Sequence, residues 1–113
     1  MSEPTVKEQE LTRRRDFALL QLDWLADDIL KDNKYVEDAF IGNINYIKIY
    51  ETTDKEKYIR AKTYYEKQKE QSLQKNTRNY LEKHHSLNKK ITRFNSKLKE
   101  IEVSRITKVK VKV

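Results

Sequence analysis

Apolar residues recur at helical spacing in the first third of the chain. They are densest over residues 17–30, where an inner line advances in steps of four, three and four. This line consists of Ala18, Leu22, Leu25 and Ile29. Such steps gather side chains on one face of a helix, so the stretch predicts an amphipathic helix that provides the main burial surface of the protein.

Capping and turn residues predict where this first helix begins and where it is interrupted. Pro4 is suited to a first helical turn, and Thr5 with Glu8 has the spacing of a capping box. We therefore expect the helix to begin near Pro4 or Thr5. The pair Asp32-Asn33 predicts a pause before a second segment.

The second segment, residues 34–50, has two interpretations. Residues 43–50 are rich in Ile and Tyr, which is typical of a strand. A helical stripe is formed by Val36, Phe40, Ile44 and Ile47. We favour the helix, with a break or kink at Gly42, because glycine in a helix interior costs about 1 kcal/mol relative to alanine.

A heptad repeat dominates the second half of the chain. Its first line consists of Leu73, Tyr80, Leu87, Phe94 and Ile101. Its second line, polar at first and apolar later, consists of Thr77, His84, Ile91 and Leu98. A turn at residues 52–54, with Thr53 and Glu56 at capping-box spacing, is expected to precede this helix. A single helix over residues 54–102 would be a rod about 70 Å long.

The end of the chain changes period. From Val109 to Val113, valine alternates with lysine, which is a strand signature. Two interpretations of residues 103–113 stay open, namely a tail that adds to the edge of a partner's sheet and a disordered basic tail.

The elements together predict an all-α protein. We expect an elongated helical hairpin or coiled coil with one long heptad-bearing helix and a short basic C-terminal tail that could form a strand. The predicted divisions are an N-terminal amphipathic helix or helix pair at residues 1–52, a long coiled-coil helix at 53–102 and the Val/Lys tail at 103–113.

Composition argues against an enzyme. Only 36% of the 113 residues are hydrophobic, so a thick apolar core cannot form. The absence of cysteine excludes disulfides, thiolate zinc sites and a cysteine nucleophile, and the single glycine excludes a glycine-rich phosphate loop. His84 and His85 point about 100° apart on a helix and cannot share a metal ion. We therefore expect no catalytic residue, no cofactor, no metal site and no small-molecule substrate.

Charge is distributed unevenly along a chain whose net charge is +7. Residues 1–54 carry a net charge of −5 and residues 55–113 a net charge of +12, which favours an antiparallel hairpin. Basic side chains that could contact nucleic acid or an acidic partner are Arg13, Arg14, Arg15, Lys89, Lys90, Arg93 and Lys97.

These patterns predict a small, non-enzymatic coiled-coil subunit that scaffolds a hetero-oligomeric complex through helix packing with other helical subunits. A homodimer is an alternative assembly. The predicted partner interface consists of Phe17, Leu22, Trp24, Leu25, Ile29, Tyr65, Leu73, Tyr80, Leu87, Ile91, Phe94, Leu98 and Ile101. Two other functions stay open: sequence-nonspecific binding to nucleic acid backbones, and a regulatory or inhibitory protein that inserts a helix in a partner's groove.

Location in the cell is inferred from what the sequence offers for targeting. No apolar run approaches the roughly 20 residues that span a bilayer, and the first residues are polar, so we expect an intracellular protein, in the nucleus or cytoplasm. The stretch Leu87…Ile91-Thr92-Arg93-Phe94…Leu98-Lys99-Glu100 resembles the end of the N-terminal helical domain of ING-type chromatin adaptors. That resemblance implies a nuclear complex, although this chain lacks the zinc-binding finger of those adaptors.

Overall fold

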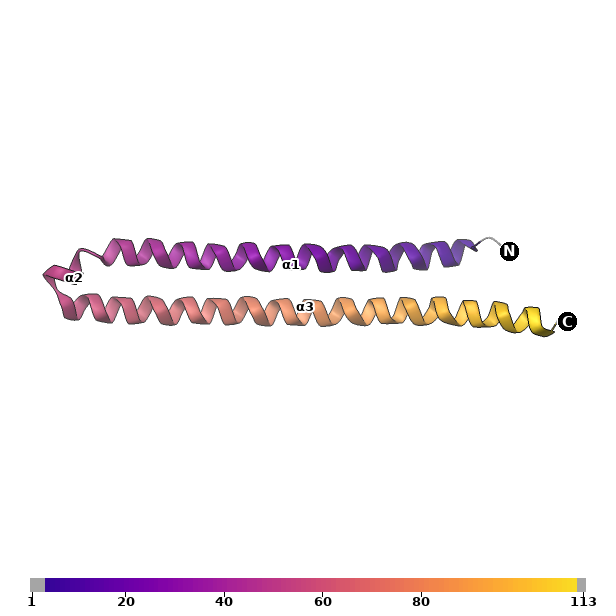
Figure 1. The fold of residues 1–113 in the computed structure, drawn as a ribbon. Coiled ribbons are helices and arrows are strands. Elements are labelled where there is room, and N and C mark those ends of the chain that lie inside the picture. Colours follow the sequence, from indigo (N-terminus) through magenta and orange to yellow (C-terminus); the bar gives the residue numbers. More distant parts are fainter. Residues whose placement is uncertain (1–3, 112–113) are drawn as a thin grey trace. The chain divides into compact units, whose positions relative to one another are not determined.

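The computed structural model describes the backbone of residues 4–111 and the side chains of residues 4–107 (Figure 1). The elements are α1 (Val6–Ile47), α2 (Tyr50–Thr53) and α3 (Lys55–Val111). Residues 4–111 contain no strand. The prediction of an all-α protein with one long heptad-bearing helix is confirmed.

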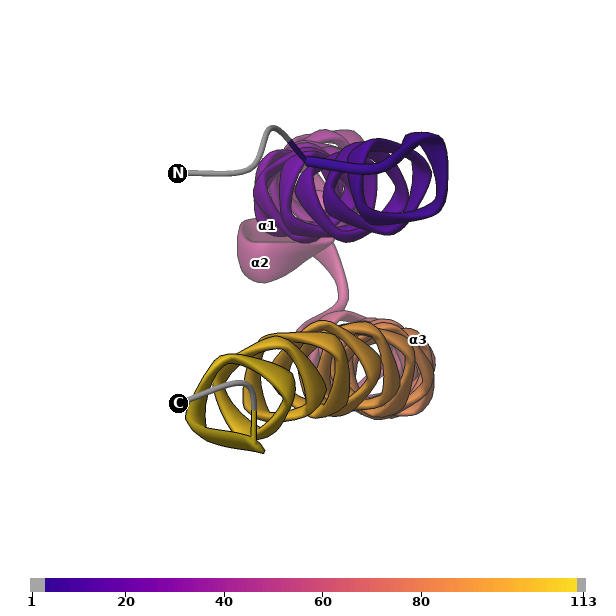
Figure 2. The ribbon, with the colours of Figure 1, turned by 90° about the vertical axis from the view of Figure 1, so that its right-hand side faces the viewer.

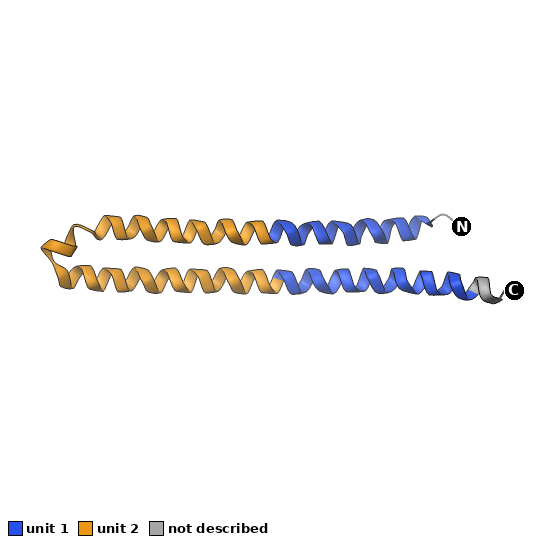
Figure 3. Cartoon of the chain, in the orientation of Figure 1, with its two compact units in different colours: residues 1–25, 83–113 blue, residues 26–82 orange. Residues whose placement is uncertain are grey.

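The chain divides into two compact units (Figure 3). Unit 1 combines Met1–Leu25 with Lys83–Val113, and unit 2 is Ala26–Glu82. In unit 1, Glu8 of α1 bonds to Arg105 of α3, whereas Arg15, one helical stretch later, bonds to Asn95. As residue numbers increase along α1, the numbers of their partners on α3 decrease, so the two helices of unit 1 are antiparallel.

Unit 2 is an antiparallel pair of helical segments closed by α2. The Asn76 side-chain amide donates to the Asn33 oxygen at 3.2 Å, and Lys69 lies 4.7 Å from the centre of the Phe40 ring. Viewed along their length, α1 and α3 lie side by side (Figure 2). The predicted helical hairpin is therefore confirmed in unit 2, which contains the turn, and unit 1 is an antiparallel helix pair.

The first helix begins where the capping box predicts. The Glu8 backbone N–H donates to Thr5 Oγ1 at 3.2 Å, and the Thr5 N–H donates to Glu8 Oε1 at 3.4 Å. However, α1 continues through Asp32-Asn33 and Gly42, so the predicted pause and break are both wrong. Burial of the stripe on either side of Gly42 outweighs the small helix cost of one glycine.

The stripe of the second segment also excludes the strand interpretation. Residues 43–47 are helical, and residues 48–49 form the turn. The half-buried residues are Val36, Phe40 and Ile44, and Ile47 is buried. Their side chains share one helix face only at the helical period, so packing against α3 selects the helix over the local strand preference of Ile and Tyr.

The turn lies close to its predicted position, but a different residue caps α3. Thr53 belongs to α2, where its hydroxyl donates to the Ile49 carbonyl oxygen at 2.9 Å. Asp54 leaves the helical backbone conformation, with φ −153° and ψ 86°, and its Oδ1 accepts the Lys57 N–H at 3.2 Å. Asp54 is thus the N-cap of α3, and the predicted Thr53–Glu56 box is wrong.

Replacing Asp54 by alanine is expected to cost about 1 kcal/mol of unfolding free energy, because the first turn of α3 loses its side-chain acceptor. Urea unfolding followed by circular dichroism measures the change. Glu51→Ala is the matched control, since Glu51 is an exposed acid in the same turn with no side-chain hydrogen bond among the described residues. Equal effects of the two substitutions would contradict the cap assignment.

The seam of α3 follows the predicted heptads in the later part of the helix. The half-buried positions from Tyr80 onward are Tyr80, His84, Leu87, Ile91, Phe94, Leu98, Ile101 and Arg105. Earlier, the seam advances in steps of four through Tyr65, Lys69 and Leu73. Because of this shift Asn76 faces α1 and Thr77 is exposed, so the predicted place of Thr77 in the seam is wrong.

Asn33 and Asn76 form a polar pair in an otherwise largely apolar seam. Asn76→Ala is expected to cost about 1–2 kcal/mol, because the half-buried Asn33 amide loses its partner. The double substitution Asn33→Leu with Asn76→Leu is expected to recover that loss, since both polar groups are gone. Urea unfolding of both variants measures these changes. A double variant less stable than Asn76→Ala would contradict the paired role.

The tail is helical as far as the structure describes it. Because α3 extends through Val111, both the strand interpretation and the disordered interpretation are wrong for residues 103–111, and residues 112–113 lie outside the described residues. Extending a formed helix needs no new nucleus, whereas a strand needs a sheet edge to pair with.

Candidate partner-binding groove

Unit 1 holds the entire net charge of the protein. It contains 14 basic and 7 acidic residues, whereas unit 2 contains 11 of each. The predicted division into an acidic first half and a basic second half therefore does not describe the folded units, because each unit takes part of both halves. Any electrostatic attraction for an anionic partner is concentrated on unit 1.

An open groove of about 470 Å³ lies between α1 and α3 in unit 1. It is lined by Arg13, Arg14, Phe17, Ala18, Gln21, Lys90 and Phe94. Ala18 is 2% exposed, whereas Phe17 is about half exposed. The groove therefore combines a small buried residue, two aromatic rings and three cations.

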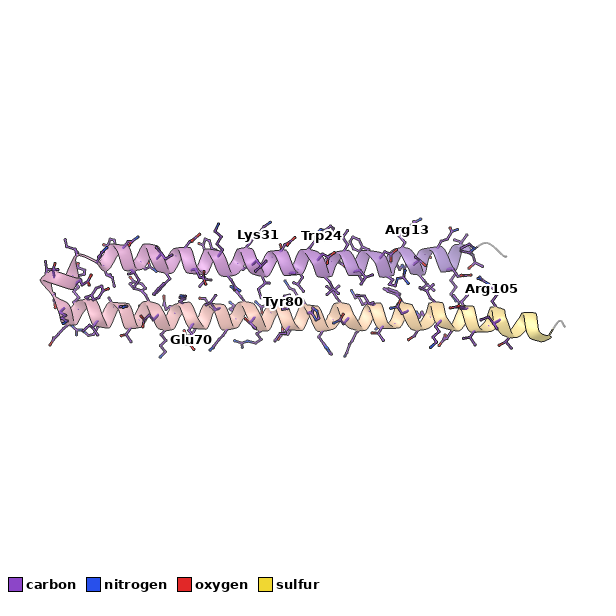
Figure 4. All side chains as sticks on the ribbon, viewed as in Figure 1. Arg13, Trp24, Lys31, Glu70, Tyr80 and Arg105 are labelled. Carbon is purple, nitrogen blue, oxygen red and sulfur yellow. The ribbon has the colours of Figure 1, made fainter. Side chains whose placement is uncertain are left out.

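Three large apolar side chains continue from this groove along α1. Phe17, Leu20 and Trp24 are 52%, 42% and 49% exposed, and their spacing of three and four residues places them on one face. The Phe17 and Trp24 rings meet edge to face with centroids 6.0 Å apart. We call these three residues the outer stripe. Figure 4 shows Arg13 and Trp24 on the outer side of α1.

The arginines of unit 1 differ in whether their charge is already paired. Ion pairs join Arg14 to Glu10 at 2.6 Å, Arg15 to Asp16 at 3.1 Å, and Arg105 to Glu8. By contrast, Arg13 and Lys90 form no ion pair within the described part of the chain. These two groove cations are therefore available to an anionic ligand.

Unit 2 has a smaller depression in which a lysine covers part of the aromatic surface. Its volume is about 140 Å³, and it is lined in part by Tyr35, Phe40 and Tyr65. The Lys69 ammonium lies over the Phe40 ring at 4.7 Å, so a cation of the same chain already covers that aromatic surface. The groove of unit 1 is the more open of the two.

Most residues of the predicted partner interface lie on the seam inside the chain. The half-buried ones are Leu22, Leu25, Ile29, Tyr65, Leu73, Tyr80, Leu87, Ile91, Phe94, Leu98 and Ile101. Phe17 and Trp24 are exposed. These half-buried residues expose less surface than Phe17 and Trp24, and Phe94 also lines the groove.

The predicted basic contacts all lie in unit 1. Arg13, Arg14, Lys89, Lys90, Arg93 and Lys97 are exposed, and Arg15 is half-buried. The structure brings Arg13, Arg14 and Lys90 to the same groove, and it directs Arg15 to Asp16 and Asn95 instead. Lys89, Arg93 and Lys97 do not line the groove.

The predicted partner interface does not include two residues of this surface, Leu20 and Gln21. Leu20 completes the outer stripe, and its position three residues after Phe17 and four before Trp24 was the available signal. Gln21 lines the groove as a polar residue, and no pattern in the sequence marks it.

Other candidate chemistry is sparse in the described residues. They contain no group of three or more histidine or acidic side chains arranged to hold a metal ion. His84 is half-buried and His85 exposed, as the helical angle predicts. Within the same residues, no helix combines the length and apolarity that crossing a bilayer requires.

Comparisons with known proteins add no family to this description. No family model, no curated protein and no solved structure matches the chain. The resemblance of residues 87–100 to ING-type adaptors stays a local sequence prediction.

Proposed function

We propose that this protein is a non-enzymatic subunit that scaffolds a hetero-oligomeric complex by packing the outer stripe of unit 1 against a partner's helix. The observation that supports this proposal is the run of three large, roughly half-exposed apolar side chains at helical spacing. A run of this kind beside a groove is typical of helix recognition, in which anchors recur every three to four residues.

The thin core of the chain supports the same proposal. Among the described residues, the buried hydrophobic side chains are Leu11, Ala18 and Ile47. Two helices shield each other on one side only, so the outer stripe can gain further burial from a third helix. Covering the exposed halves of its three side chains would contribute about 1 kcal/mol each.

A second candidate function is sequence-nonspecific binding of nucleic acid. The concentration of all net charge on unit 1 favours it, because such a field attracts phosphate backbones. Phosphate contacts do not require the exposed apolar side chains, which is why protein scaffolding ranks first. A nuclear location would suit either function and stays a prediction.

The proposal is tested by isolating the tagged full-length chain from an extract of its source cells and then treating the bound material with nuclease. We expect a protein partner in stoichiometric amount that is lost when Leu20 and Trp24 are both changed to serine. The control changes Leu19 and Leu30 to serine, because these residues are also exposed but lie off the stripe. Absence of any partner, or release of all bound material by nuclease, would contradict protein scaffolding.

A further inference from the structure

We propose that the groove of unit 1 binds an acidic amphipathic helix of a partner protein. This inference rests on the proposed function and specifies the chemistry of the partner. The groove and the outer stripe form one surface, because Phe17 belongs to both.

The apolar part of the groove matches the nonpolar face of a helix. Ala18 is small and buried at the base, and Phe17 and Phe94 contribute rings from α1 and α3. A small residue allows close helix approach, and packed helices have axes about 8–10 Å apart. A large aliphatic side chain of the partner can therefore enter between the rings, and its neighbours one turn away can reach Leu20 and Trp24.

The cations of the groove favour a partner whose binding surface is negatively charged. Arg13 and Lys90 stand on opposite helices of the groove, and neither has an ion-pair partner within the described residues. Lys83 and Lys97 lie seven residues on either side of Lys90 and are also exposed, so they extend the same helix face. Carboxylates that flank the partner's apolar stripe would meet these cations along about two heptads.

A second copy of the chain fits this groove less well than an acidic helix. Unit 1 of a second copy would bring the same excess of 7 positive charges, and unit 2 is neutral. Neither unit carries a net negative charge, and the acidic helix of a second copy, α1, already packs its apolar seam against α3. Nucleic acid supplies the charge but offers no aliphatic face for Phe17, Ala18 and Phe94.

The test measures binding of a synthetic helical peptide of about 20 residues, with Leu at the a and d positions and Glu at the e and g positions, to the full-length protein. Two control peptides replace either the glutamates by lysine or the leucines by serine. Lys90→Glu and Phe17→Ser alter the groove. Lys99→Glu and Leu19→Ser are matched controls on exposed residues of unit 1 that do not line it.

We expect the acidic peptide to bind the wild-type protein, more weakly at higher salt, and the two control peptides not to bind. Lys90→Glu and Phe17→Ser should each weaken binding by at least about tenfold, while the two matched controls bind like the wild type. Equal binding of the acidic and lysine peptides, or equal effects of Lys90→Glu and Lys99→Glu, would overturn the inference. So would binding of a single-stranded or duplex oligonucleotide in place of the acidic peptide.

Failure of this inference can be told apart from failure of the proposed function. If the extract yields a stoichiometric protein partner that depends on the outer stripe, but the acidic peptide does not bind or displace that partner, only the inference is wrong. If the extract yields no protein partner, the scaffolding function itself is wrong.

Discussion

Replacing Ala18 by glutamate is expected to cost about 3 kcal/mol or more and to abolish the ordered packing of unit 1. Ala18 is 2% exposed and lies where α1 meets α3. A longer side chain either overpacks the contact between α1 and α3 or turns into the groove, where its carboxylate loses hydration against the rings of Phe17 and Phe94. Arg14 and Lys90 line the same groove but are exposed, so an ion pair with either of them offsets only part of this cost. Urea unfolding and amide hydrogen exchange of residues 4–25 measure the loss.

Ala26→Glu is the control for this substitution. It makes the same chemical change eight residues later in α1, at an exposed position, so its expected effect lies within about 0.5 kcal/mol of zero. Both substitutions change helix propensity equally. Similar stabilities for the two variants would show that Ala18 is not in the packed seam.

The second large effect is expected in unit 2. Ile47→Ala should lower the unfolding free energy by about 2–4 kcal/mol, because Ile47 is only 4% exposed and alanine leaves a cavity beside α3. Loss of this side chain also weakens the end of α1 where the chain turns. The change is measured by urea unfolding together with hydrogen exchange of residues 36–47.

Ile49 provides the matched control for Ile47. It lies two residues later in the turn and is 66% exposed, so Ile49→Ala removes the same atoms without opening a cavity. Its expected cost is about 0.5 kcal/mol or less. A cost for Ile49→Ala as large as that for Ile47→Ala would contradict the orientation of α1 against α3.

Period and capping spacing predicted the helices well because both are local properties of the chain. The inner line from Ala18 to Ile29 and the heptads from Tyr80 to Ile101 are on the seam, and the box of Thr5 and Glu8 begins α1. The wrong predictions concern positions where two local patterns compete, or where packing against the other helix determines the structure. Thr53 and Asp54 both could cap a helix, and backbone geometry selected Asp54.

The surface chemistry was less predictable, because it depends on which residues of the two helices become neighbours. Arg105 is one of the basic residues of the C-terminal half, yet it forms an ion pair with Glu8 of α1. Arg13 and Lys90 are 77 positions apart in the sequence and line one groove. Neither pairing can be derived from spacing within one helix; each follows from the antiparallel alignment of α1 with α3.

Completion of the outer stripe by a different protein is tested by the mass and the thermal unfolding of the purified chain. Light scattering over a wide concentration range should give the monomer mass of 13.7 kDa, and circular dichroism should show a helical protein whose melting temperature does not change with protein concentration. A stable homo-oligomer that melts sharply and loses its cooperativity when Leu20 and Trp24 become serine would contradict completion by a different protein, since self-association would then cover the stripe.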